Sequence, residues 1–212
     1  WSHQKIYYPQ YFDSKLSSIL KDSPDVIIIP IGIETSQGAH TNILFWNLKN
    51  KELERFEPNG KNPPATFNYN GDLLDNFLIE KFKKFGKEFK YYKPSEYLPT
   101  IGFQMIENLE TEKCKQIGDP NGFCTVWCIW YCYQKLLNLN IKSIDLSEEL
   151  INNIKLEGKS FKNLIRNFSK NISDYRDEYL MKVNLDINLW ISGNYNEEEL
   201  SNLEKEIIKL LS

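Results

Sequence analysis

Apolar residues in the first half of the chain fall into short runs with the spacing of β-strands. The pattern predicts four strands, over residues 25–33, 42–48, 52–57 and 89–92. The first run is almost continuously apolar, as expected of a buried strand, but Pro30 and Gly32 within it indicate a bulge or a sheet edge. A short polar stretch separates the second run from the third, which predicts an antiparallel hairpin.

Other stretches repeat their apolar residues at the three- and four-residue intervals of a helix. They predict a short helix or arm over residues 11–21, an amphipathic helix over 73–85 and an apolar helix over 123–138. Residues 145–149 have the pattern of a capped helix start, and the chain beyond them is expected to be helical with a break at 191–194. Residues 94–121 show neither pattern and are expected to be irregular.

These elements predict an α+β fold, in which a mixed β-sheet packs on a central helix and a helical extension follows at the C-terminus. The expected organisation is an N-terminal arm over residues 1–23, a core over 24–140 and a helical extension over 141–212 packed on the core. No internal repeat or low-complexity segment is visible in the sequence. Because the chain begins with Trp rather than Met, we expect a fragment of a longer or processed protein.

Composition narrows the classes of partner. A hydrophobic content of 41% and an aromatic content of 14% indicate a globular core, and a net charge of −3 argues against nucleic-acid binding by bulk charge. No apolar run reaches the ~18 residues that span a bilayer, and no signal peptide is visible, so no membrane partner is expected. Of the four cysteines, three lie on one predicted helix and cannot easily pair, which favours a reducing, cytoplasmic compartment.

A polar turn containing Gly122 runs directly into the apolar helix, and Cys124 stands at the junction. The first N–H groups of a helix have no partner, and its dipole places partial positive charge there. Both effects favour a thiolate, so Cys124 is a candidate nucleophile. Cys124, Cys128 and Cys132 recur every four residues, and the alternative is that all three belong to the core, which we expect of the latter two. A metal site is disfavoured because no paired Cys-x-x-Cys motif or histidine cluster is present.

A thiol nucleophile needs a base and a group that orients the base. The chain has two histidines, His3 near the terminus and His40 just ahead of the second predicted strand. Glu57 ends the third strand, and the midpoint between His40 and Glu57 falls inside the predicted turn, so the two side chains are expected side by side. The alternatives are a structural His40, a surface Glu57 bonded to Arg55, and Glu54 as the acid, although Glu54 has the opposite pleat parity.

The order His40, Glu57, Gln104, Cys124 resembles the cysteine peptidases that include the SUMO-specific proteases, the adenovirus endopeptidase and the Yop-type effectors. The motifs that carry the resemblance are His-x-Asn at 40–42, Glu-Pro-x-Gly at 57–60, Gly-x-Gln-x-x-Glu at 102–107 and Asp-Pro-x-Gly-Phe-Cys at 119–124. Their wording is closest to a subgroup associated with large DNA viruses. The resemblance implies that Cys124 attacks as thiolate, His40 moves its proton, Glu57 orients His40, and the Gln104 amide stabilises an oxyanion.

The chain departs from that family at two positions. Thr41 follows His40 where the SUMO proteases carry a tryptophan that roofs the cleft. Gln104 lies far upstream of Cys124, whereas the oxyanion glutamine of those proteases precedes the nucleophile by a few residues. Gln116 is nearer to Cys124 and is the alternative donor, although Gln104 fits the viral wording better.

The resemblance implies a monomeric thiol protease that removes ubiquitin or a ubiquitin-like protein from substrates, with no cofactor and no metal. Its partner would be that modifier, and a viral or effector chain would act in the host cytosol or the virion. The alternatives are a viral maturation protease that cuts Gly-containing polyprotein sites and an acyltransferase of the Yop type. A binding module without activity is disfavoured because all the needed residue types are present.

Overall fold

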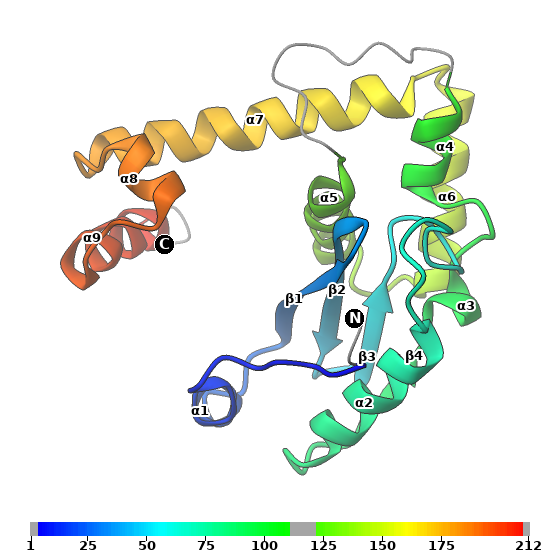
Figure 1. The fold of residues 1–212 in the computed structure, drawn as a ribbon, viewed down its shortest axis with the longest axis horizontal. Helices are drawn as coiled ribbons and strands as arrows, with labels where there is room; N and C mark the ends of the chain where they lie inside the picture. The colour runs from blue at the N-terminus through cyan, green and yellow to red at the C-terminus, as the bar shows by residue number, and fades with distance from the viewer. Residues whose placement is uncertain (1–3, 111–121, 210–212) are drawn as a thin grey trace. The chain divides into compact units, whose positions relative to one another are not determined.

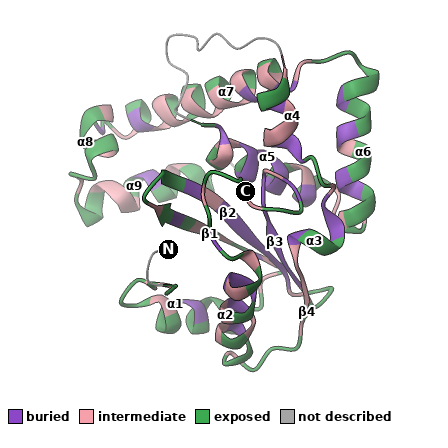
Figure 2. Cartoon of the chain, turned by 45° about the vertical axis from the view of Figure 1, so that its right-hand side comes forward, coloured by how far each residue is buried: buried purple, intermediate pink, exposed green. Residues whose placement is uncertain are grey.

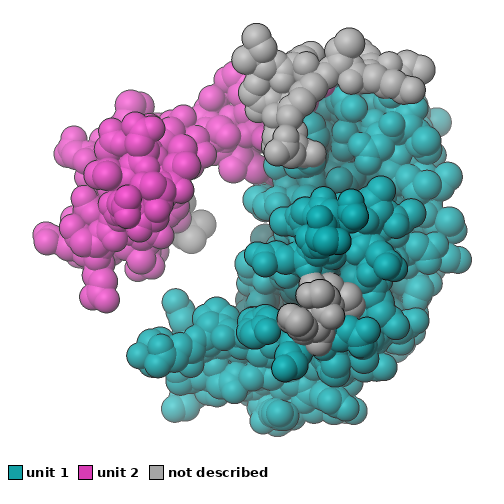
Figure 3. Space-filling model, viewed as in Figure 1, with its two compact units in different colours: residues 1–165 teal, residues 166–212 magenta. Residues whose placement is uncertain are grey.

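The structure is a computed structural model that describes residues 4–110 and 122–209. The chain forms two compact units, residues 1–165 and residues 166–212, which Figure 3 shows in different colours. Each unit is described by itself below. The arm, core and extension expected from the sequence, with boundaries at residues 23 and 140, stay a prediction.

The sheet of the first unit is mixed and small. Its strands are β1 (Val26–Thr35), β2 (Gly38–Asn47), β3 (Glu52–Phe56) and β4 (Lys90–Tyr92), in the order β1-β2-β3-β4. The first three strands pair antiparallel along the chain, and β4 adds to β3 in parallel. Both β1 and β4 are therefore edge strands, in keeping with Pro30, which lacks the N–H that a central ladder would need.

Nine helices stand in the described ranges. They are α1 (Phe12–Lys21), α2 (Gly71–Lys83), α3 (Pro94–Tyr97), α4 (Phe103–Leu109), α5 (Cys124–Leu137), α6 (Ser143–Leu156), α7 (Phe161–Lys182), α8 (Ile187–Ser192) and α9 (Glu197–Ile208). The fold class expected from the sequence is corrected by this balance: helices predominate over the four strands (Figure 1). Two of these helices, α3 and α4, occupy residues that the sequence pattern left irregular, because both are too short to show a helical repeat.

Apolar side chains cover both faces of the sheet in the first unit. On one face, Trp46 of β2 lies edge-on against Phe82 of α2, with ring centroids 5.3 Å apart. On the other face, Phe56 at the end of β3 stacks on Tyr131 of α5 at 3.9 Å. Strands β2 and β3 are consequently buried along most of their length (Figure 2). This packing places the end of β2 beside the first turn of α5, where Thr41 and Thr125 are hydrogen-bonded.

The pairing of β2 with β3 differs from the expected register. Ile43 pairs with Phe56, so the residue after β3, Glu57, falls opposite Asn42 rather than opposite His40. The turn between β2 and β3 is centred one residue further along the chain than the midpoint of His40 and Glu57. Lys51 within this turn adopts a left-handed conformation with φ of 56°. His40 therefore lies three residues beyond the last pair of the ladder, where its side chain reaches Glu57 diagonally.

The second unit has a small core of its own. Leu180, Leu185 and Leu203 are buried together, and Trp190 stacks on Tyr195 with centroids 4.9 Å apart. Asp186 caps α8 through the N–H groups of its first turn, and α9 begins in a capping box. Gly193 ends α8 in the left-handed conformation, at the break expected from the sequence. Among the described residues, no helix has both the length and the apolar character needed to cross a bilayer.

Candidate functional site

His40 and Glu57 form a buried pair at the end of the β2–β3 hairpin. His40 is 2% exposed and Glu57 is 1% exposed, and His40 Nε2 lies 2.7 Å from Glu57 Oε1. Because Glu57 engages Nε2, the other ring nitrogen, Nδ1, is left for the Cys124 thiol, with which His40 is also hydrogen-bonded. The structure thus brings together three of the four residues singled out from the sequence.

Cys124 is the first residue of α5, at the position where the helix N–H groups have no intrahelical partner. Its N-cap residue, Phe123, makes no side-chain hydrogen bond to this end of the helix. Partial burial raises the pKa of the thiol. The hydrogen bond and charge of His40 and two hydrogen bonds from Thr41 lower it by more, so that the net pKa is about 7. The thiol is therefore half ionised near neutral pH, which makes it a stronger nucleophile than an ordinary cysteine.

His40 shifts in the opposite direction. Burial lowers the pKa of the imidazole, but the hydrogen bonds to Cys124 and Glu57 and the charges of both raise it to about 9. Since the thiol then loses its proton at lower pH than the imidazole does, a thiolate–imidazolium pair is the dominant state between pH 7 and 9. Such a pair is ready to attack an electrophile without a separate deprotonation step.

Glu57 accepts hydrogen bonds on both carboxylate oxygens. Oε1 receives His40 Nε2 and the backbone N–H of Asn59 at 2.9 Å. Oε2 accepts from Asn42 Nδ2 at 2.9 Å and from the Tyr69 hydroxyl. Four donors on two oxygens leave the carboxylate little freedom to rotate away from His40.

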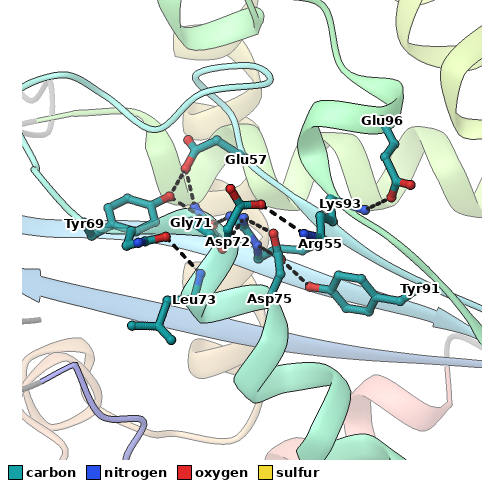
Figure 4. A network of polar contacts seen from close by, with 12 residues as sticks. Arg55, Glu57, Tyr69, Gly71, Asp72, Leu73, Asp75, Tyr91, Lys93 and Glu96 are labelled. Carbon is teal, nitrogen blue, oxygen red and sulfur yellow. Dashed lines mark hydrogen bonds and ion pairs between the residues drawn. The ribbon is translucent and has the colours of Figure 1, made fainter.

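Behind Glu57 the polar network continues through Arg55 to α2 (Figure 4). Arg55 Nη1 donates to Asn42 Oδ1 at 2.5 Å, and the guanidinium binds Asp75 through Nε at 2.6 Å and Nη2 at 2.9 Å. Tyr91 of β4 donates to the same carboxylate at 2.6 Å. Because its carbonyl oxygen accepts from Arg55, Asn42 must turn its amide nitrogen toward Glu57.

Gln104 lies in the first turn of α4 and faces the segment that leads into Cys124. Its Nε2 would stand 3.8 Å from a Cβ added at Gly122, while its Oε1 is buried and has no hydrogen-bond partner among the described residues. The amide donor is thus directed toward the approach to Cys124. Gln116, the alternative donor, lies outside the described residues.

The start of α4 is fixed against the loop that follows Glu57. The N–H groups of Gly102 and Gln104 donate to Asn59 and Pro58, both at 2.9 Å. A Cβ at Gly60 would lie 2.6 Å from the Pro99 carbonyl oxygen, so the two backbones touch where only glycine fits. Contacts between backbones thereby couple the position of Gln104 to that of Glu57.

The remaining candidates from the sequence point away from the site. Glu54 accepts from Tyr131 at 3.0 Å and from Ser143, on the α5 side of the sheet, as its pleat parity implied. Cys128 and Cys132 are buried, and burial raises the pKa of Cys128 well above its usual value and that of Cys132 to about 12. Within the described ranges, no group of histidine, cysteine and carboxylate side chains is arranged to hold a metal ion.

Two aromatic residues of the site were missed by sequence reasoning. Phe67 and Tyr69 lie in the segment between β3 and α2, and their rings lie 5.2 Å and 6.4 Å from the ring of His40. Residues 59–71 are rich in proline, asparagine and glycine, a composition typical of a loop. Two aromatic residues inside an otherwise polar loop were the signal that could have indicated a packing role.

Comparison with known proteins gives one viral relative. A protein of Acanthamoeba polyphaga mimivirus, described as putative ankyrin repeat protein L371, is 45% identical over 201 residues. The match covers 91% of this chain and 26% of the viral protein, so the chain spans about a quarter of its relative's length. No family model matches the chain, and no solved structure matches it.

These findings correct the family assignment made from the motifs. The matching protein is described by ankyrin repeats and not as a peptidase, and no peptidase model or structure accompanies it. The assignment to the SUMO-protease-like cysteine peptidases is therefore wrong, and so is the fold class taken with it, because ankyrin repeats are built from pairs of helices. The activities inferred from that family are wrong for the same reason: isopeptidase, viral maturation protease and acyltransferase.

Proposed function

We propose that this chain is a protein-binding region with an activated thiol, Cys124, which bonds covalently to an electrophilic group of a partner. One observation carries the proposal: His40 stands between Glu57 and Cys124, paired with Glu57 at 2.7 Å and hydrogen-bonded to the thiol at the mouth of α5. Three unlike groups in this order are more than a core needs, since a buried cysteine packs equally well as a neutral thiol.

Each residue has a separate role in the proposed chemistry. Cys124 Sγ adds to the carbon of a carbonyl group on the partner, the carbon–oxygen π bond opens to an oxyanion, and the proton that the thiol has lost stays on His40. Glu57 keeps the imidazole charged and turned toward the sulfur. In this proposal the Gln104 amide and the N–H groups at the start of α5 donate hydrogen bonds to that oxyanion.

A protein is the partner class that we propose. The viral relative is described by ankyrin repeats, and stacked repeats of this kind build extended surfaces for binding. Ubiquitin and its relatives remain the finer prediction for that partner. Calorimetric titration of each into a Cys124→Ala variant tests it, because the variant keeps the surface without the reaction.

Alkylation kinetics test the activated thiol. The rate at which iodoacetamide labels Cys124, mapped by mass spectrometry and followed against pH, gives the pKa of that thiol. We expect about 7 in the unchanged protein. His40→Ala removes a hydrogen bond and a charge that lower this pKa, so it should rise toward the ordinary value of 9.0.

Cys128→Ser is the matched control, since Cys128 is buried on the same helix and its loss should leave the profile of Cys124 unchanged. An ordinary pKa in the unchanged protein, with no response to His40→Ala, would overturn the proposal.

A further inference from the structure

Thr41 follows His40 on β2 and contacts the first two turns of α5 through three groups. Its hydroxyl oxygen lies 2.7 Å from the hydroxyl of Thr125. Its carbonyl oxygen accepts from Cys128 Sγ at 3.5 Å, and its N–H and hydroxyl both hydrogen-bond to Cys124. The residue after the base is thereby joined to the nucleophile and to the residue after the nucleophile.

The sheet explains why the backbone of Thr41 is free for these contacts. β3 ends at Phe56, whose partner is Ile43, so Thr41 lies beyond the last β2–β3 pair. In an antiparallel strand, the N–H and C=O of one residue point to the same side. Since the Thr41 carbonyl reaches α5, its N–H is directed there as well, where β3 no longer provides a partner.

We propose that Thr41 and Thr125 form a hydroxyl relay that stabilises the Cys124 thiolate, with Thr125 donating to Thr41 and Thr41 donating to the sulfur. The inference rests on the proposed role of Cys124 as nucleophile and adds two residues that touch or support the reacting atom. Thr41 is the residue in contact with the sulfur. Thr125 acts through Thr41 and is a positioning residue.

The direction of the relay follows from proton counting. A hydroxyl carries one proton, and a thiolate can only accept. Once the thiolate has formed, the Thr41 proton must point to the sulfur, which leaves Thr41 Oγ1 to accept from Thr125. Linked donors polarise one another, so the outer hydroxyl strengthens the inner bond.

Among the described residues, few charged groups act on the Cys124 sulfur, so uncharged hydrogen-bond donors also contribute to stabilising the thiolate. His40 approaches from β2 and carries the only positive charge among the groups whose influence on the thiol is resolved. Glu57 acts through His40, and Cys128 lies one turn further along α5. Cys128 stays neutral because burial raises its pKa. The hydroxyl and the N–H of Thr41 are therefore the uncharged donors that stabilise the thiolate.

Paired substitutions test the relay. Thr41→Val keeps the shape and the strand preference of threonine but removes the donor, whereas Thr41→Ser keeps the donor. In the pH profile of Cys124 alkylation, Thr41→Val should raise the thiol pKa by about one unit, as expected for one lost hydrogen bond to a charged group. Thr41→Ser should lie close to the unchanged protein.

Thr125 supplies the second half of the test. It is exposed on α5, so Thr125→Val is expected to fold even if Thr41→Val does not. Thr125→Val should raise the thiol pKa by less than Thr41→Val does, and Thr125→Ser should restore it. Because Thr125 acts through Thr41, the double valine variant should show no larger shift than Thr41→Val alone.

The outcomes separate the relay from the proposed function. A low thiol pKa in the unchanged protein that neither valine variant moves would overturn the relay and leave the activated thiol standing. Additive shifts in the double variant would show two independent donors and would also overturn it. An ordinary thiol pKa in the unchanged protein would remove the proposed function itself.

Discussion

At the scale of single residues, His40 and Cys124 set each other's charge. Cys124 raises the pKa of His40, and His40 lowers the pKa of Cys124, because the charged forms attract each other and share a hydrogen bond in a partly buried site. Glu57 adds the negative charge that keeps His40 protonated. The sequence could name these three residues from their order, but not Asn42 or Tyr69, whose bonds to Glu57 depend on side-chain positions that no pattern records.

Glu57→Gln tests the charge on the carboxylate while leaving its shape in place. The amide removes the negative charge that raises the His40 pKa, so that pKa should fall from about 9 toward the ordinary value of the imidazole. The thiol pKa should rise in response. NMR titration of the His40 ring measures the first shift, and a His40 pKa unchanged at about 9 would contradict the role given to Glu57.

At the scale of elements, the end of the hairpin, the start of α4 and the first turn of α5 are joined by contacts between distant parts of the chain. The strands and α5 could be predicted from their apolar periodicity. The β2–β3 register could not, because the turn geometry that shifts it is local to residues near Lys51. The attachment of α4 depends on the close backbone contact of Gly60 with Gly102. The two residues are far apart in the sequence, so no local sequence pattern predicts this contact.

Gly102→Ala tests this attachment. A Cβ there would overlap the backbone of Gly60 and lie 2.6 Å from the carbonyl carbon of Asn59. The start of α4 must then shift, at a cost of about 1–3 kcal/mol for overpacking. Gly32→Ala is the control, because a Cβ at Gly32 meets nothing within 4 Å. Equal urea midpoints for the two variants would contradict the close packing described.

Arg55 joins β3 to α2 through its buried bond with Asp75. The two side chains are 4% and 2% exposed, so Arg55→Met would leave a buried carboxylate without its partner. We expect a loss of about 3–5 kcal/mol in the free energy of unfolding. Lys51→Met is the matched control, since the Lys51–Glu88 pair is 62% and 79% exposed and should contribute within about 1 kcal/mol. A similar loss in both variants, measured by urea unfolding, would argue against a special role for the Arg55 network.

At the scale of the whole molecule, the thiolate–imidazolium pair links the site to stability. His40, with its pKa raised from 6.5 to about 9, contributes stability that is present below pH 6.5 and lost as pH rises through 9. Cys124, with its pKa lowered from 9.0 to about 7, contributes stability that is present above pH 9 and lost as pH falls through 7. Between pH 7 and 9 the two slopes oppose each other and nearly cancel.

Cys124→Ser breaks this balance. The hydroxyl stays neutral, so only the histidine slope remains, and stability should fall as pH rises from 6.5 toward the lowered His40 pKa of the variant. The slope can reach about 1.4 kcal/mol per pH unit. Urea unfolding at a series of pH values measures it, with Cys132→Ser as a control that keeps the pair. A variant whose stability does not depend on pH in this window would show that His40 is not charged.

With these pKa values, the folded chain holds a thiolate and an imidazolium side by side at neutral pH. Direct titration of both groups tests it: thiolate absorbance in the ultraviolet, as the difference between the protein and Cys124→Ser, and the NMR signal of the His40 ring, which has only His3 to be told apart from. We expect a thiolate midpoint of about 7 and a His40 midpoint of about 9. A thiolate midpoint at roughly 8.5 or above together with a His40 midpoint near the ordinary value of roughly 6.5 would contradict it.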